Sequence, residues 1–292
     1  MFSYRHAFHA GNHADVLKHV ALIACLKHLA AQDKALMVLD THAGAGLYRL
    51  DGDYANTSHE AEHGLLKLVA GARDGLAPAI QDYLLLVQSF NTGGKWKVYP
   101  GSPFIIQRFL AGRDRLKAFE IHPTDSRTLD KNLAQLDAGR QVAVAHEDGF
   151  GTVKKYLPPP SRRALVVCDP SYEMKSDYGR VEDYVQEALQ RFATGVYFIW
   201  HPIIPRPEAH GLPRRLATLA RKAGKPFLHA TLTVKSSKIT QAADGSAQRP
   251  GLPASGVFVI NPPHTLRAAL AEALPQLVRA LGQDRNAAFE LV

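Results

Sequence analysis

The clearest pattern in the chain is a set of short apolar runs separated by polar and helical stretches. Seven of these runs are long enough for strands, and several are rich in β-branched residues, which is typical of strands buried on both faces of a parallel sheet. They cover residues 35–39, 116–119, 142–145, 164–168, 196–200, 227–234 and 257–260. Strands and helical segments alternate in the first part of the chain, so the pattern predicts an α/β fold with a doubly wound sheet.

Two helix starts carry capping signals. Asn12 precedes apolar residues that recur at three- and four-residue steps, and Asp15 stands at the capping-box distance from it. This helix is predicted to run to about Gln32. Ser102 is predicted to be the N-cap of another helix, because Pro103 follows it and proline suits the first helical position.

A segment with a different pattern separates the first predicted strand from the second. From Tyr48 to Tyr99 the apolar positions are compatible with helices, and glycine-containing breaks interrupt them at 71–75 and 91–94. We interpret residues 48–99 as a small inserted helical subdomain. Residues 1–47 and 100–292 then form the main α/β domain.

Charge and cysteine content narrow the partners and the compartment. The 292 residues carry a net charge of +8, which favours a polyanionic partner, either nucleic acid or a membrane surface. Nucleic acid is favoured, because no apolar run reaches the about 18 residues of a spanning helix and the first residues lack a signal-peptide pattern. Cys25 and Cys168 lie in apolar segments, so we expect buried free thiols in a reducing cytoplasm.

Basic residues gather between the fifth and sixth predicted strands. They are Arg206, Arg214, Arg215, Arg221, Lys222 and Lys225. Two interpretations stay open for this segment: a solvated helix face, or a patch that contacts phosphates.

The most specific chemistry follows the fourth predicted strand, where the chain reads Asp169, Pro170, Ser171, Tyr172. Pro170 ends the strand, so Asp169 is expected at the carboxyl edge of the sheet, where open α/β sheets bind ligands. The Asp169 carboxylate and the Pro170 carbonyl can each accept one N–H of an exocyclic amine, and the carboxylate can take the proton when that amine is methylated. Tyr172 offers a ring on which a base can stack. The alternative is a proline turn with Asp169 as its cap and Tyr172 in the core.

The first predicted strand ends in an acid and a glycine-rich turn, from Asp40 to Gly46. This order is typical of a loop that binds a nucleotide or a cofactor. As a dinucleotide fingerprint it fails, because Arg49 stands where the third glycine is required. The next strand-end acid, Glu120, lies far beyond the spacing of about 20 residues of a nicotinamide site. The sequence therefore argues against a dehydrogenase.

Four histidines near the amino terminus raise the question of a metal site: His6, His9, His13 and His19. Gly11 breaks a simple helical pair between two of them, and no cysteine or carboxylate cluster completes a zinc set. We expect no metal ion. The first residues are interpreted as a polar, aromatic arm that either folds over a site or is solvated.

Together, the seven strands, the glycine-rich turn and the amine-binding strand end resemble an S-adenosylmethionine-dependent methyltransferase. Residues 3–19 and 40–46 closely resemble the RlmJ family of bacterial large-subunit ribosomal RNA adenine-N6 methyltransferases. The similarity extends over the whole chain and includes residues 99–103, 191–195 and 260–263. It implies a Rossmann-like sheet of seven strands with a small helical subdomain inserted after the first.

The resemblance also implies S-adenosylmethionine as cofactor and an adenine of 23S ribosomal RNA, swung out of its helix, as substrate. Carried over motif by motif, the cofactor-binding residues are His19, His42, Ser102, Glu120, Asp148, Gly149 and Asp169. Tyr4, His6 and Lys18 would contact the base, and Asp169 would accept the proton. The family motif is Asp-Pro-Pro-Tyr, whereas this chain has Ser171 in third place, so we expect a less rigid loop but a retained activity.

We expect a monomer that acts on naked 23S ribosomal RNA or an early assembly intermediate, with no membrane and no metal ion. Two alternatives stay open. The same strand end would serve a DNA adenine or a protein glutamine methyltransferase. Ser171 and the net charge of +8 would also suit a catalytically inactive RNA-binding protein.

Overall fold

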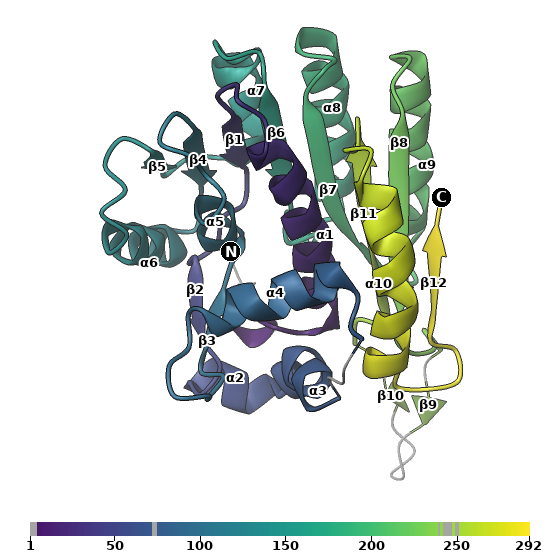
Figure 1. The fold of residues 1–292 in the computed structure, drawn as a ribbon. Helices are drawn as coiled ribbons and strands as arrows, with labels where there is room; N and C mark the ends of the chain where they lie inside the picture. Colours follow the sequence, from purple (N-terminus) through teal and green to yellow (C-terminus); the bar gives the residue numbers. More distant parts are fainter. Residues whose placement is uncertain (1–4, 72–74, 239, 242–246, 249–250) are drawn as a thin grey trace.

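A computed structural model describes residues 5–71, 75–238, 240–241, 247–248 and 251–292. These residues build an eight-stranded sheet in the order β12-β8-β11-β7-β6-β1-β4-β5 (Figure 1). The strands are β1 (Met37–Asp40), β4 (Arg115–Phe119), β5 (Val142–Ala145), β6 (Ala164–Cys168), β7 (Val196–Ile203), β8 (Phe227–Thr233), β11 (Ala254–Ile260) and β12 (Ala288–Leu291). From β7 to β5 neighbouring strands are parallel, while β11 pairs antiparallel with β7 and β8. The predicted α/β fold is confirmed.

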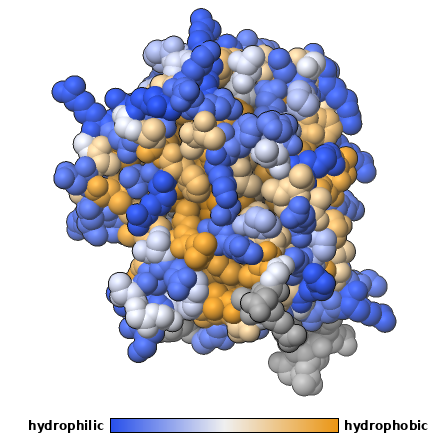
Figure 2. Space-filling view, in the orientation of Figure 1, coloured by the Kyte–Doolittle hydropathy of each residue, from blue (hydrophilic) through white to orange (hydrophobic). Residues whose placement is uncertain are grey.

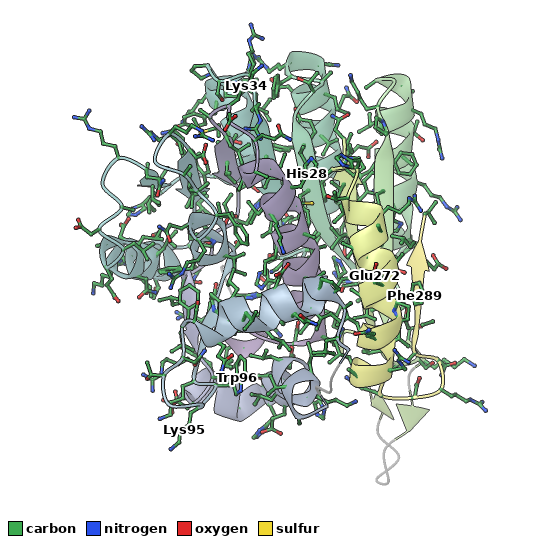
Figure 3. The ribbon with its side chains drawn as sticks, in the orientation of Figure 1. His28, Lys34, Lys95, Trp96, Glu272 and Phe289 are labelled. Atoms are coloured by element: carbon green, nitrogen blue, oxygen red, sulfur yellow. The ribbon has the colours of Figure 1, made fainter. Side chains whose placement is uncertain are left out.

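The strand count differs from the prediction. All seven predicted strands are present, but β12 adds an eighth by pairing antiparallel with β8 at the edge of the sheet. Three of its four residues are exposed, including Phe289, which lies at the outer side of the molecule (Figure 3). An edge strand with so few buried positions has no continuous apolar run, and the sequence pattern therefore missed it.

Both faces of the central strands are covered by helices. In β6, Leu165 and Val167 pack into a core cluster with α1 (His13–Ala30) and α10 (Leu266–Leu281). The alternate residues of β6 pack into a second cluster with α8 (Ser176–Arg191) and α9 (Pro207–Lys222) (Figure 1). Since successive side chains of a strand point to opposite faces, a strand buried on both faces is apolar at every position.

The segment between the first and second predicted strands is helical, as expected. It contains α2 (Asp53–Ser58), η2 (Glu60–His63), α3 (Leu65–Ala70) and α4 (Pro78–Gln88). Its two ends meet in an antiparallel pair of short strands that was not predicted, β2 (Leu47–Arg49) and β3 (Val98–Pro100). Helix α4 packs against α1. In Figure 2, apolar side chains gather in the middle of the side of the molecule that is turned toward the viewer, which is otherwise mostly polar.

One of the two predicted helix starts is confirmed, and one is off by a residue. Asn12 is the N-cap of α1, and its side chain accepts hydrogen bonds from the backbone N–H groups of residues 14 and 15, both at 2.9 Å. Helix α5 (Ser102–Gln107) has Gly101 as its N-cap, so Ser102 is already its first residue. A Cβ at Gly101 would lie 3.0 Å from the Gly46 carbonyl oxygen, which favours glycine where the chain meets the glycine-rich turn.

Helix α6 (Pro123–Ala134) connects β4 to β5 and packs against β5. The remaining elements are short: η1 (His6–Phe8), η3 (Gly149–Gly151), α7 (Thr152–Tyr156), β9 (Thr240–Gln241) and β10 (Ala247–Gln248). Cys25 and Cys168 are buried free thiols, as predicted. Among the described residues, no helix is both long enough and apolar enough to cross a membrane.

Candidate active site at the carboxyl edge of the sheet

The carboxyl ends of four neighbouring strands, β6, β1, β4 and β5, meet at one edge of the sheet. The loop after β1 is bound to the ends of both neighbouring strands: the Thr41 N–H donates to Val167 O of β6 at 3.0 Å, and the Ala43 N–H donates to Phe119 O of β4 at 2.9 Å. A Cβ at Gly149 would lie 1.8 Å from the Thr41 carbonyl oxygen, so the loop after β5 lies directly on the loop after β1. Parallel topology thus brings together strand-end residues that are far apart in the sequence.

The glycine-rich turn after β1 is held by Glu120 from the end of β4. The Gly44 N–H donates to Glu120 Oε2 at 2.8 Å, and the His122 N–H donates to Oε1 at 2.7 Å. Gly44 and Gly46 have φ of +60° and +79°, a region in which glycine is favoured. Burial raises the pKa of Glu120, although the two backbone N–H groups oppose this. The turn therefore presents bare backbone beside a carboxylate that still has lone pairs free to accept.

Asp148, after β5, lies between a backbone donor and a cation. Its Oδ1 accepts from the Phe150 N–H at 3.0 Å, and its Oδ2 pairs with the guanidinium of Arg180. Arg180 also lies over the Phe150 ring, 4.2 Å from its centroid, and the His42 ring meets that phenyl ring edge-on at 4.8 Å. Burial lowers the pKa of His42 to about 4, so His42 is neutral at pH 7. Sequence reasoning missed Arg180 and Phe150, because neither belongs to a recognisable motif.

Two buried polar groups near this edge of the sheet have unused hydrogen-bonding capacity. The Asp40 carboxyl is fully buried and its oxygens make no well-aligned hydrogen bond with a described residue, although the Ser102 side chain and the His42 backbone lie close enough to favour its charged form. Burial, reinforced by the nearby Asp169, raises the pKa of Asp40 to about 7. His19 is also fully buried; its Nδ1 lies 2.7 Å from the Tyr99 hydroxyl, while Nε2 contacts no described partner. Burial and the neighbouring Lys18 hold the pKa of His19 well below its usual value.

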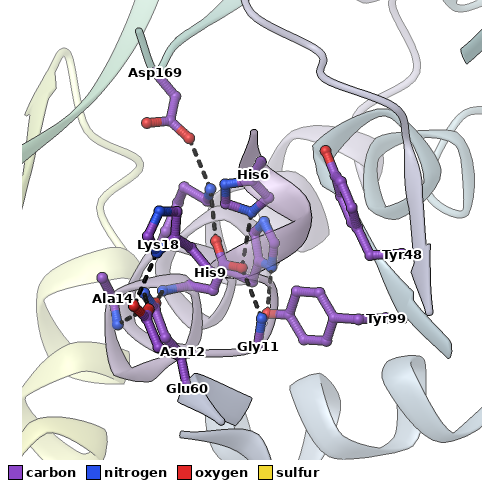
Figure 4. Close-up of polar contacts among 12 residues, drawn as sticks. His6, His9, Gly11, Asn12, Ala14, Lys18, Tyr48, Glu60, Tyr99 and Asp169 are labelled. Atoms are coloured by element: carbon purple, nitrogen blue, oxygen red, sulfur yellow. Dashed lines mark hydrogen bonds and ion pairs between the residues drawn. The ribbon is translucent and has the colours of Figure 1, made fainter. Parts of the chain in front are cut away.

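Asp169, at the end of β6, is paired with Lys18 from α1. Lys18 Nζ donates to Asp169 Oδ2 at 2.7 Å and to Asp15 Oδ1 at 2.8 Å (Figure 4). Burial alone would lower the pKa of Lys18, but the two carboxylates raise it above its usual value. Lys18 is therefore a buried cation shared between two acids. The sequence predicted both residues for the site but gave no sign that they form an ion pair.

The amino-terminal arm folds onto the site, which was one of its two predicted arrangements. His6 Nε2 lies 3.0 Å from Asp15 Oδ2, and the His6 ring meets the Tyr48 ring at 5.0 Å (Figure 4). His9 Nδ1 lies 2.9 Å from Glu60 Oε1 in η2. Tyr4, predicted to contact the base, lies outside the described residues.

The four amino-terminal histidines contact four different partners. His13 Nε2 contacts the Leu252 carbonyl oxygen at 3.0 Å, and the other three contact Asp15, Glu60 and Tyr99. Within the described part of the chain, no group of three or more histidine, cysteine, aspartate or glutamate side chains is arranged to hold a metal ion.

Tyr172 lies in the core, as the alternative interpretation of the strand end expected. Its ring is 3 % exposed and packs against Tyr178 at 4.7 Å, and its hydroxyl donates to the Trp200 carbonyl oxygen at 2.7 Å. A base cannot stack on a ring that is covered in this way, so we do not place Tyr172 in contact with substrate. Ser171 is exposed, and Tyr172 has a φ of +53°, a conformation that the contacts of its side chain hold in place.

The basic segment lies on α9 and the turn that follows it. Arg215 Nε pairs with Glu182 Oε2 of α8 at 2.6 Å, and Arg214 and Lys222 line the same groove between the two helices. Pairing of Arg215 within the protein fits a solvated helix face, whereas the shared groove fits a phosphate contact. Both interpretations stay open.

Comparisons with known proteins give a consistent picture. A family model described as "Ribosomal RNA large subunit methyltransferase D, RlmJ" matches residues 33–290. The chain is 38 % identical over 282 residues to the "Ribosomal RNA large subunit methyltransferase J" of Haemophilus influenzae, covering 96 % of this chain and 94 % of the relative. It is 39 % identical over 277 residues to the protein of the same name from Escherichia coli K12, covering 95 % and 93 %. A crystal structure of a Legionella pneumophila protein superimposes with a TM-score of 0.84 at 28 % identity, covering 97 % of this chain and 98 % of that one.

Proposed function

Because this chain belongs to the RlmJ family of ribosomal RNA large subunit methyltransferases, we propose that it methylates 23S ribosomal RNA with S-adenosylmethionine as methyl donor. The target atom is the N6 amino group of an adenine. The observation that carries this proposal is the strand end of Asp169 and Pro170, which lies at the same edge of the sheet as the glycine-rich turn after β1 and the strand-end acid Glu120 that holds it. That arrangement suits a flat, amide-like amine and a nucleoside-containing cofactor in neighbouring positions.

The residues at the carboxyl ends of β1, β4 and β5 fit S-adenosylmethionine, which supplies the electrophilic methyl group when it is bound. The unpartnered carboxyl of Asp40 suits the ammonium group of the methionine moiety, and the positive φ of Gly44 and Gly46 lets the backbone approach that moiety. Glu120 keeps lone pairs for the ribose hydroxyls. Asp148 suits the adenine amino group, with the Phe150 ring beside it.

Five further residues complete the proposed cofactor site. His19, with its unused Nε2, and Ser102, close to Asp40, lie on the methionine side. His42 borders the Phe150 ring on the adenine side, and Gly149 lies so close to Thr41 that a side chain would not fit there. Asp169 joins this site to the amine site, because the methyl group must pass between the two.

In the proposed reaction Asp169 and Pro170 act on the target amine. Lys18 occupies Asp169 Oδ2, which leaves Oδ1 to accept one N–H of the amine while the Pro170 carbonyl accepts the other. Bound S-adenosylmethionine would supply the methyl group, with its S–CH3 bond broken and the neutral thioether S-adenosylhomocysteine as leaving group. The amine nitrogen that receives the methyl group becomes tetrahedral and positively charged, and its proton passes to Asp169. A newly methylated ammonium is much more acidic than the neutral amine, so a carboxylate held in an ion pair is basic enough. His6 and Lys18, together with Tyr4, are the residues we propose to contact the base.

The sheet, the insertion and the charge support the rest of the proposal. We propose that residues 48–99 act as a helical subdomain attached to the methyltransferase domain, and that the enzyme is a monomer in the cytoplasm. The net charge of +8 favours RNA, because phosphates attract a basic protein and release counterions on binding. A target adenine must leave its stack to reach Asp169.

Methyl transfer from tritium-labelled S-adenosylmethionine to 23S ribosomal RNA, duplex DNA or protein, each offered separately, tests this function. We expect label in RNA, and in N6-methyladenosine after digestion to nucleosides. Label in DNA or protein would identify a different amine as substrate. RNA binding without transfer would instead indicate an inactive binding protein.

A further inference from the structure

The proposed reaction makes no use of Asp15, a buried carboxylate in the first turn of α1. It is 2 % exposed and contacts His6, the Gly11 backbone and Lys18. Its Oδ2 accepts from the Gly11 N–H at 2.9 Å and lies 3.0 Å from His6 Nε2, while its Oδ1 accepts from Lys18 Nζ at 2.8 Å. In a capping box this side chain would accept from the backbone N–H of the N-cap residue, Asn12. Here it accepts from the backbone N–H of Gly11 and from Lys18 instead.

Asp15 is ionised despite its burial. Burial would raise the pKa of Asp15, but His6 and Lys18 hold it well below its usual value. A carboxylate can only accept hydrogen bonds, so His6 donates from Nε2. Asp15 thus joins the amino-terminal arm to Lys18, and Lys18 joins Asp15 to Asp169.

The charges around Asp169 show what Asp15 adds. Lys18 is the cation that faces both acids from α1, and Asp40 faces Asp169 from β1. His19 is neutral because its pKa is lowered, and the tyrosines near Asp15, which are Tyr48, Tyr83 and Tyr99, are neutral because burial raises their pKa. Lys18 therefore serves both carboxylates, whereas His6 contacts Asp15 and not Asp169. Without Asp15, Lys18 and Asp169 would form a closed neutral pair, and Asp169 would be a weaker hydrogen-bond acceptor.

We propose that Asp15 is a positioning residue that shares Lys18 with Asp169, and so keeps the Asp169 carboxylate oriented and basic enough to accept the proton of the target amine. This inference rests on the proposed role of Asp169. The same carboxylate holds His6, which we place at the base, so one buried group fixes both the arm and the proton acceptor.

The test is the pH dependence of single-turnover methyl transfer in Asp15→Asn, with cofactor and RNA at saturation. Without the second carboxylate, Lys18 pairs with Asp169 alone and stabilises its charged form more strongly, so the acidic limb of the rate profile should move to lower pH. The maximal rate should fall at least about tenfold, because a weaker base takes the proton less readily. The KM for S-adenosylmethionine should stay unchanged.

Glu60→Gln is the matched control. Glu60 also binds a histidine of the arm and the start of α1, through His9 at 2.9 Å and the Asn12 side chain at 2.9 Å, but these contacts do not lead to Lys18. We expect its rate and its pH profile to match the wild type. Equal losses in Glu60→Gln and Asp15→Asn would reduce Asp15 to an anchor for the arm and overturn the inference.

Lys18→Met provides a second variant, in case a neutral Asp15 prevents folding. With the cation gone and Asp15 still negative, the charged form of Asp169 loses its partner, and the acidic limb should move to higher pH. A limb that stays in place in either variant that folds contradicts the inference. Asp169→Asn measured alongside separates the two claims: if it keeps full activity, the proposed role of Asp169 itself is wrong, whatever Asp15 does.

Discussion

Replacing Asp40 by asparagine should make the cofactor-free protein more stable above neutral pH and weaken its binding of S-adenosylmethionine. The Asp40 carboxyl is fully buried and unpartnered among the described residues, and its pKa is raised from 3.8 to about 7. Between these values the folded protein holds a proton that the unfolded chain has lost. The free energy of unfolding therefore falls as the pH rises through this window, and the loss is complete above about pH 7.

The size of the effect follows from the two pKa values. A difference of one pKa unit corresponds to about 1.4 kcal/mol, so an ionised Asp40 lowers the free energy of unfolding by about 4 kcal/mol. Asparagine keeps the shape of the side chain without the charge. Asp40→Asn should therefore recover most of that energy at alkaline pH and very little at acidic pH, where Asp40 is already protonated in both states.

Urea unfolding of both proteins at several pH values, without cofactor, measures this difference. Asp114→Asn is the control, because Asp114 is 3 % exposed but accepts from the Leu36 and Ala111 N–H groups, both at 2.8 Å. Loss of a satisfied acceptor should destabilise that variant by about 1–3 kcal/mol. Calorimetric titration should show weaker cofactor binding in Asp40→Asn alone. A stability difference between wild type and Asp40→Asn that does not grow with pH would refute the reasoning.

Three further predictions concern the same site and α9. Glu120→Ala should weaken S-adenosylmethionine binding in a calorimetric titration, because the Gly44 N–H and the ribose of the proposed cofactor lose the same acceptor. An unchanged affinity in a folded variant would remove Glu120 from the site. Reversal of the charge at Arg214 and Arg215 should make the RNA-binding constant less dependent on salt. The slope of its logarithm against the logarithm of salt concentration should fall by about 0.7–0.9 for each phosphate that the protein no longer neutralises. An unaltered slope would identify this part of α9 as a solvated face. Ser171→Pro should give equal or higher turnover, since Ser171 is exposed and proline limits the freedom of the loop; a clear loss would show that this loop must move.

The core of the fold could be predicted from the sequence because local rules and burial agree there. The strand β6 is apolar at every position, since α1 and α10 cover one of its faces and α8 and α9 the other, and Asn12 caps α1 by a purely local interaction. The edge strand β12 escaped detection, because its side chains are mostly exposed and only pairing with β8 defines it.

The sequence singled out candidate residues at the strand ends, but it could not predict their contacts. Strand ends and motifs predicted Asp148 and Asp169, yet the Arg180 partner of the first and the Lys18 partner of the second depend on how α8 and α1 pack against the sheet. Tyr172 shows the converse case. An aromatic ring next to a catalytic motif suggests stacking, but its burial depends on Tyr178 and Trp200, which no local pattern connects to it.

The most direct test of the central claim is single-turnover methyl transfer to 23S ribosomal RNA by Asp169→Asn and by the wild type, under saturating labelled cofactor. Asparagine keeps the shape and part of the hydrogen bonding of Asp169, but it cannot take up the proton. We predict that the wild type places the label in N6-methyladenosine and that the variant is at least about a hundredfold slower with RNA binding little changed. Near-normal turnover in Asp169→Asn, or label in another nucleoside, would show that the chemistry does not take place as proposed at this strand end.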